Sequence, residues 1–376
     1  MNLTICRLRT LCIFGAIAIL SHCSEPSSEP PPIVDDIAVP KNVILLIGDG
    51  MGLSQVSSAL YFQDSTSNFE RFPVIGLIKN SSSSDKITDS AAGATAFSCG
   101  KKSYNGAIGV GPDSTDIENI LEKISNLNLR TGLIATSSIT HATPASFYAH
   151  VKSRDLEEDI AKQLINANID FFAGGGKKFF NQRKDGLNLI NELEANNLIV
   201  DTTGLADPGN LSADEKYGYL LAANDMPKVS EGRGNYLENA SRLALDYLSN
   251  NQDGFFLMIE GSQIDWGGHD NDGDYLISEL LDFDRTIGMV LDYQESHPNT
   301  LVIVTADHET GGFTLSSKHD PSTGSSDYNT IDPSFSTGGH SATMIPVFAK
   351  GEGSEEFGGV YENTDIFHKI LHVTNW

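Results

Sequence analysis

The strongest constraint on the fold is a regular alternation between short apolar runs and segments with helical periodicity. The run at 43–47, VILLI, is rich in β-branched and leucine residues, as in a strand buried on both faces. Similar runs lie at 131–135, 169–172, 255–259 and 301–305, and helical patterns separate them at 116–127, 155–167, 236–248 and 275–293. This order predicts an α/β fold with a largely parallel sheet. The polar stretch 322–332 is expected to be a surface loop or an excursion.

The first 23 residues are predicted to be a signal peptide rather than part of the fold. Arg7 and Arg9 precede an apolar run at 11–20, which is too short to span a bilayer. The run ends in LSHC, so Cys23 resembles the lipidated first residue of a mature lipoprotein; the alternative is an ordinary cleaved signal peptide in which Cys23 is incidental. Residues 24–39 then form a polar tether rich in proline and serine.

Composition narrows the class of protein further. Of the 4 cysteines only Cys99 lies in the body of the chain, which excludes an internal disulfide framework there. The remaining length of roughly 340 residues is enough to bury a core as one large domain. The net charge of −25 argues against a nucleic-acid-binding surface, and it means that an anionic substrate would have to be attracted by local cations.

Residues 87–101, ITDSAAGATAFSCGK, carry the most informative local pattern. Ser90 precedes small, helix-compatible residues, which places its hydroxyl at a helix N-terminus, where free backbone N–H groups favour anions. Ser90 is therefore either an N-cap or a nucleophile that attacks an anionic substrate. The chain has no G-x-S-x-G elbow around it, so activation of the hydroxyl would have to come from metal ions.

Metal-ligand residues follow three of the apolar runs at the point where each run ends. Asp49 follows 43–47, Glu260 follows 255–259, and Asp307 and His308 follow 301–305. Asp265 and His269 have i, i+4 spacing, and His340 lies in a glycine loop before a further run at 345–349. Each alone has an ordinary explanation as a turn, cap or loop residue. Together they predict a metal site at the carboxyl edge of a parallel sheet, with His and Asp ligands suited to Zn²⁺ and oxygen ligands to Mg²⁺.

Long ordered strings cover the body of the chain. They are VILLIGDGMG (43–52), TDSAAGATAFSCG (88–100), HATPASFYAHV (141–151), EGSQIDWGGHDN (260–271), TADHETGGFT (305–314) and STGGHSATMIPVFAKG (336–351). With these strings the chain resembles the alkaline phosphatase family, and in particular its compact bacterial and cold-adapted members. The resemblance implies a three-layer sandwich, with a largely parallel central sheet flanked by helices, and a catalytic domain at 40–376.

The resemblance also implies a role for each site residue. Ser90 is the nucleophile, and Arg154 grips two phosphoryl oxygens. The metal set is two Zn²⁺ and one Mg²⁺: Asp265, His269 and His340 hold the first zinc; Asp49, Asp307 and His308 hold the second; Asp49, Thr143 and Glu260 hold magnesium. His141 and Trp266 stand where the enteric bacterial enzyme has an aspartate and a lysine, and both are expected just outside the metal and phosphate contacts.

The implied activity is hydrolysis of phosphate monoesters to an alcohol and inorganic phosphate through a phosphoserine, with an alkaline optimum. The resemblance further implies a homodimer with a small subunit contact. With the signal peptide it implies a periplasmic or cell-envelope location. A sulfatase of the same metal superfamily needs x-Pro-x-Arg after its key residue, whereas AAGA follows Ser90. A phosphodiesterase and an exported binding protein without turnover remain as alternatives.

Overall fold

The computed structural model describes residues 39–376, which belong to one compact unit. The predicted signal peptide, Cys23 and nearly all of the predicted tether lie outside the described residues. In the part of the chain that is described, no helix has both the length and the apolar character needed to cross a bilayer.

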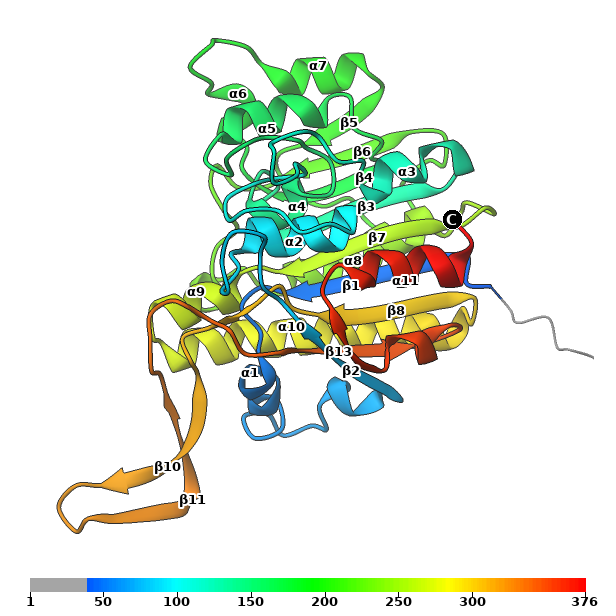
Figure 1. The fold of residues 1–376 in the computed structure, drawn as a ribbon. Coiled ribbons are helices and arrows are strands. Elements are labelled where there is room, and N and C mark those ends of the chain that lie inside the picture. Colours follow the sequence, from blue (N-terminus) through cyan, green and yellow to red (C-terminus); the bar gives the residue numbers. More distant parts are fainter. Residues whose placement is uncertain (1–38) are drawn as a thin grey trace, which may run out of the picture. The chain divides into compact units, whose positions relative to one another are not determined.

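A sheet of 10 strands forms the centre of the molecule, in the order β14-β2-β13-β8-β1-β7-β3-β4-β6-β5 (Figure 1). Seven neighbouring strands are parallel: β8 (Thr300–Thr305), β1 (Asn42–Gly48), β7 (Phe255–Gly261), β3 (Arg130–Ser138), β4 (Phe171–Gly175), β6 (Lys216–Leu220) and β5 (Leu198–Asp201). Strand β13 (Ile345–Lys350) pairs antiparallel with β8 and with β2 (Val74–Lys79), and β14 (Gly359–Glu362) completes the edge. The predicted α/β class with a largely parallel sheet is confirmed.

Helices cover this sheet as two groups. Helix α8 (Tyr236–Leu248) packs against α10 (Gly273–Ser296), and both contact the central strands. Helix α2 (Ser90–Cys99) packs against α4 (Ala142–Ala145) and α11 (Asp365–Thr374) as a second group (Figure 1). The three-layer arrangement is therefore as expected. The other helices are α1 (Leu53–Ser58), α3 (Ile120–Lys123), α5 (Glu157–Leu164), α6 (Lys178–Asn181), α7 (Leu189–Ala195) and α9 (Gln263–His269).

Strand β1 sets the position of the site because it lies between β8 and β7, and candidate ligand residues follow all three strands. All its residues are buried, as expected for a strand covered on both faces. Ile47 pairs with Glu260 of β7 on one side and with Thr305 of β8 on the other. The three strands therefore end together, and the residues that follow them lie at one edge of the sheet.

The structure departs from the predicted elements in two places. Only α3 and a 3₁₀ turn at Ser125–Leu127 form within the predicted helix at 116–127. The stretch 322–332, expected to be a loop or an excursion, is mostly strand, because β10 (Thr314–Asp320) and β11 (Ser325–Ser334) form an antiparallel hairpin (Figure 1). The short strands β9 (Glu309–Thr310) and β12 (His340–Ser341) pair with each other next to the site.

Candidate active site

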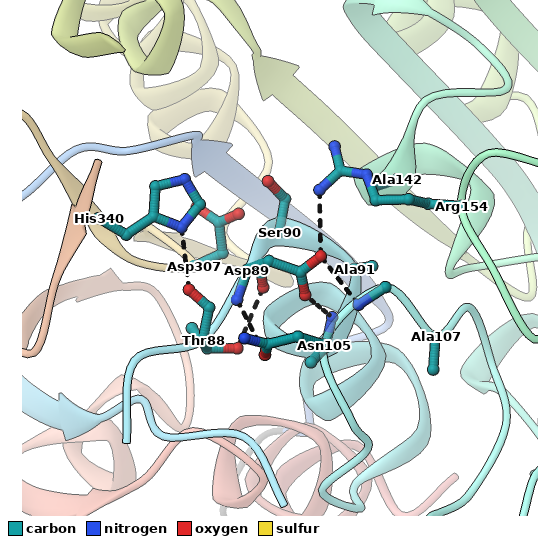
Figure 2. Close-up of polar contacts among 12 residues, drawn as sticks. Thr88, Asp89, Ser90, Ala91, Asn105, Ala107, Ala142, Arg154, Asp307 and His340 are labelled. Atoms are coloured by element: carbon teal, nitrogen blue, oxygen red, sulfur yellow. Dashed lines mark hydrogen bonds and ion pairs between the residues drawn. The ribbon is translucent and has the colours of Figure 1, made fainter. Parts of the chain in front are cut away.

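Ser90 is the first residue of α2, and its hydroxyl is not needed to cap that helix. Asp89 is the N-cap, and its Oδ1 accepts a hydrogen bond of 3.0 Å from Ala92 N. Ser90 Oγ instead lies 3.2 Å from His308 Nε2, and the residue is only 2% exposed. Figure 2 shows Ser90 between Arg154 on one side and Asp307 and His340 on the other. Its N-terminal place on α2 leaves backbone N–H groups nearby for an anion.

Asp265, His269 and His340 form the first group of converging side chains. Asp265 and His269 are one turn apart on α9, with 3.4 Å between Asp265 Oδ1 and His269 Nε2. The Nε2 atoms of His269 and His340 are 3.1 Å apart. The Nδ1 atoms face carbonyl oxygens, of Gly338 at 2.7 Å and Thr88 at 2.9 Å, so each Nδ1 carries the proton. With Nδ1 as the donor, each ring faces the same point with Nε2, the arrangement that metal-binding histidines use.

Asp49, Asp307 and His308 form the second group, and all three side chains have 0% exposure. His308 Nε2 lies 3.5 Å from Asp49 Oδ1 and 3.3 Å from Asp307 Oδ2. Burial lowers the pKa of His308 to about 3, so its ring is neutral at ordinary pH. Asp307 Oδ1 accepts from Gly50 N at 3.2 Å and His308 N at 3.0 Å, which leaves Oδ2 facing the group.

Glu260 and Asp49 meet in a third group, with His141. Ligand atoms of these three residues lie within 4.8 Å of one another. Glu260 Oε2 accepts from Ser262 Oγ at 2.7 Å, and Glu260 Oε1 faces the group. Thr143, in α4, is fully buried. A ring nitrogen of His141 thus lies beside these two carboxyl groups, and the sequence analysis expected the residue near the magnesium.

Whether cations fit these groups can be judged from the buried polar atoms. Six buried atoms of these groups and of Thr143 have no hydrogen-bond partner within the described residues: Asp49 Oδ1 and Oδ2, Glu260 Oε1, Asp307 Oδ2, Thr143 Oγ1 and His141 Nδ1. Burial, and after it the neighbouring carboxyl groups, raises the pKa of Asp49, and burial raises that of Glu260 to about 8. Buried acids that are crowded and unpaired in this way are stabilised by cations, so the donor set fits metal ions.

Arg154 faces the same space from the other side. Its Nη1 donates to Asp89 Oδ2 at 3.2 Å (Figure 2). Its Nη2 donates to His141 Nε2 at 3.1 Å. A cleft lined by His141, Ala142, Arg154, Asp155 and Glu157 adjoins it. Trp266 stands edge-on to His141, with ring centroids 5.9 Å apart. Sequence reasoning did not include Asp89; its place before Ser90, in TDS, was the available signal.

Comparison with known proteins assigns the chain to a family. A family model described as "Alkaline phosphatase" matches residues 40–330. The chain belongs to the alkaline phosphatase family. It is 38% identical to alkaline phosphatase 3 of Bacillus subtilis (strain 168) over 293 residues, which are 73% of this chain and 62% of that protein. The chain therefore spans somewhat less than two thirds of the length of that relative.

Solved structures of alkaline phosphatases resemble the chain more fully. The alkaline phosphatase of the Antarctic bacterium TAB5 shares 57% sequence identity, with a TM-score of 0.89, over 90% of this chain and 99% of that one. A variant of the TAB5 enzyme, with one histidine replaced by aspartate, has magnesium bound in its M3 site; it shares 56% identity at a TM-score of 0.88, over the same shares of the two chains. The family and the fold are thus established independently of the site geometry.

Proposed function

We propose that the protein hydrolyses phosphate monoesters to an alcohol and inorganic phosphate through a phosphoserine at Ser90, with an alkaline optimum. The observation that carries this proposal is the position of the Ser90 hydroxyl. It starts a helix, lies against His308 of the second ligand group, and shares its space with Arg154 (Figure 2). A nucleophile, a set of metal ligands and a guanidinium are the parts that phosphoryl transfer needs.

The metal complement we propose is two Zn²⁺ and one Mg²⁺. Asp265, His269 and His340 would hold one zinc, Asp49, Asp307 and His308 the other, and Asp49, Thr143 and Glu260 the magnesium, with His141 beside it. Bound zinc supplies Lewis-acid chemistry, which lowers the pKa of a nearby hydroxyl and stabilises negative charge on oxygen. The mixed nitrogen and oxygen donors of the first two groups suit zinc, and the oxygen donors of the third suit magnesium.

The chain's own residues then perform the transfer. Ser90 gives up its hydroxyl proton to water, and its Oγ attacks phosphorus in line. The bond from phosphorus to the ester oxygen breaks, and that oxygen takes a proton from water and leaves as the alcohol. Arg154 and the backbone N–H groups at the start of α2 hold the non-bridging oxygens, on which charge is spread. Water then attacks the phosphoserine from the side that the alcohol left, and it releases phosphate and regenerates the Ser90 hydroxyl.

A Ser90→Ala variant tests this proposal, with Ser296→Ala, an exposed serine at the end of α10, as its control. The expected result is normal zinc and magnesium content with turnover of a monoester reduced by at least roughly a thousandfold. Near-normal activity of Ser90→Ala would exclude Ser90 as the nucleophile. Faster hydrolysis of a diester than of a monoester by the wild type would favour the phosphodiesterase alternative, and phosphate binding without turnover would favour the binding protein.

We also propose that the protein is exported and acts in the periplasm or cell envelope as a homodimer. Residues 1–23 would be the signal peptide, Cys23 the carrier of a lipid anchor, residues 24–39 the tether and residues 40–376 the catalytic domain. Metabolic labelling with a radioactive fatty acid tests the anchor. We expect the wild type to carry the label and a Cys23→Ser variant to lack it. An unlabelled wild type would contradict the lipid anchor and favour an ordinary cleaved signal peptide.

A further inference from the structure

His150 is a mostly buried histidine that the proposed reaction does not use, and it lies four residues before Arg154. Its Nδ1 is 2.7 Å from Gly109 O, and its Nε2 is 3.0 Å from Glu122 Oε1 of α3. Since a carbonyl oxygen only accepts, Nδ1 carries a proton, and a hydrogen bond from Nε2 to the carboxylate needs a second one. The two contacts together are those of a charged imidazolium.

The surroundings of His150 favour this charge. Burial disfavours it, yet the pKa of His150 is raised because the Gly109 carbonyl and Glu122, followed by Asp116, stabilise the protonated ring. The side chain that faces His150 from α5 is Gln163, whose amide carries no charge. Glu122 is itself held in place, because its Oε2 accepts from Asn119 N at 2.9 Å.

The backbone after His150 leads directly to Arg154. Gln163 bonds both the N–H (2.8 Å) and the carbonyl (3.0 Å) of His150. Val151 and Ile108 then exchange two hydrogen bonds of 2.9 Å and 3.0 Å, and Arg154 N donates to Gly106 O at 2.7 Å. Segments 106–109 and 150–154 thus lie side by side, with His150 at one end and Arg154 at the other.

The same pair of segments is joined to the start of the Ser90 helix. Gly106 N donates to Asp89 Oδ2 at 2.9 Å, and that oxygen also accepts from Arg154 Nη1. Contacts that keep segments 106–109 and 150–154 paired therefore also keep the Arg154 guanidinium in its position beside Ser90. His150 supplies the only side-chain bridge from α3 to this pair among the hydrogen bonds of the described residues.

We propose that the charged form of His150 is a positioning residue for Arg154, and that it thereby sets the affinity of the site for a phosphate group. The inference rests on the proposed function, since it assigns a role to Arg154 in holding phosphate. When the His150 ring is charged, it donates hydrogen bonds to both Glu122 and the Gly109 carbonyl and so links α3 to segment 106–109. Without it, the tie to α3 is lost, Arg154 samples more conformations, and the preorganisation that favours phosphate binding is reduced.

A His150→Asn variant tests the role, because asparagine can still donate to Gly109 O but carries no charge for Glu122. The quantity to measure is the Kd of inorganic phosphate for the metal-loaded protein, by calorimetry, at pH values below and above the pKa of His150. We expect phosphate to bind the variant roughly three- to tenfold more weakly at the low values, as loss of one hydrogen bond implies. The ratio of the Kd of the variant to that of the wild type should fall toward one at high pH, where the wild-type His150 has also lost its charge.

Two further variants separate positioning from general damage to the fold. Glu122→Gln keeps the imidazole and removes its charged partner, so it should weaken phosphate binding in the same pH-dependent way. His372→Asn, at an exposed histidine on α11, should change nothing. In an Arg154→Ala background, His150→Asn should no longer alter the phosphate Kd, since the effect acts through Arg154.

The outcomes distinguish this inference from the proposed function. The positioning role is overturned if His150→Asn and Glu122→Gln both bind phosphate with the wild-type Kd at low pH. It is also overturned if His150→Asn weakens phosphate binding as much in the Arg154→Ala background as in the wild type. A wild type that binds phosphate but turns over no monoester overturns the proposed function and leaves the positioning test intact. A wild type that binds no phosphate overturns both.

Discussion

At the scale of single residues, Arg154 is the group whose chemistry depends most on its neighbours. Asp89 and His141 take one N–H from each terminal nitrogen of its guanidinium. These contacts fix the plane of the guanidinium, and its other N–H groups have no hydrogen-bond partner among residues 39–376, which leaves them for a ligand. The Arg154 side chain is 26% exposed, so a substrate can reach it from solvent.

Replacing Arg154 with lysine should therefore weaken substrate binding while the metal content stays normal. An ammonium group keeps the charge but cannot bind two phosphoryl oxygens in one plane. We expect KM for a monoester to rise roughly ten- to hundredfold, the loss of one charge-assisted hydrogen bond. Steady-state kinetics measures it, with the exposed Lys152→Arg as control. An unchanged KM would remove Arg154 from the phosphate contacts.

His141 should decide which metal the third group prefers. Its ring stands beside two carboxyl groups, where a carboxylate in its place would add an oxygen donor of the kind that magnesium prefers. His141→Asp should lower the Mg²⁺ concentration that restores half the activity of chelated protein by about tenfold or more. His297→Asp, at an exposed histidine after α10, is the matched control. Equal magnesium requirements in wild type and His141→Asp would contradict the assignment.

At the scale of elements, the contact between α2 and the end of β8 places Ser90 against the ligands. Gly93 permits this contact, because a Cβ there would lie 2.9 Å from Asp307 Cβ. Asp307 is fully buried and cannot move away freely.

Gly93→Ala should push α2 away from Asp307. The expected cost is about 1–3 kcal/mol of stability, as in other overpacked cores, together with weaker zinc retention. Thermal unfolding and metal analysis measure the two effects. Gly204→Ala, where a Cβ would meet nothing within 4 Å, should leave both unchanged. Full stability and normal zinc in Gly93→Ala would show that this contact has room to spare.

The helices and strands that could be predicted from sequence are those in which the arrangement of apolar residues indicates which faces are buried. Strand β1 is apolar throughout because both its faces are covered, and α8 begins and ends where its apolar face does. Helix α3 is shorter than predicted because Asp116 pairs with Val110 and Asn119 caps the helix in a box with Glu122. The N-x-x-E spacing was visible in the sequence, and the bridge joins Asp116 to a residue only six positions earlier.

The hairpin β10–β11 could not be predicted from the residue pattern, and the neighbours of His141 were expected only from the family resemblance. The hairpin is largely exposed, so its residues show no apolar alternation, and its strands exist through pairing with each other. His141 lies against Asp49 and Glu260 because β3 ends beside β7, and that neighbourhood is a property of the sheet order. Residues directly after strand ends, such as Asp49 and Asp307, were predictable because the strands themselves were.

At the scale of the whole molecule, the site concentrates negative charge in a chain whose net charge is already −25. Burial is the largest cause of the raised pKa of Asp49, Glu260 and Asp307. An acid whose pKa is higher in the folded than in the unfolded chain contributes stability below its unfolded pKa, and that contribution is lost as the pH rises through the folded pKa. For Glu260 this window runs from 4.5 to about 8.

Metal removal should therefore make stability depend on pH in a defined direction. Chelated protein should unfold at progressively lower temperature as the pH rises through the Glu260 window, because its ionised acids repel one another in a buried space. Protein loaded with zinc and magnesium should show a much shallower decline, since bound cations favour the ionised forms. Calorimetric unfolding of both forms across a pH series measures the difference. A Glu260→Gln variant should flatten the curve of the chelated protein, whereas parallel curves for chelated and loaded wild type would mean that the carboxyl cluster is stable without cations.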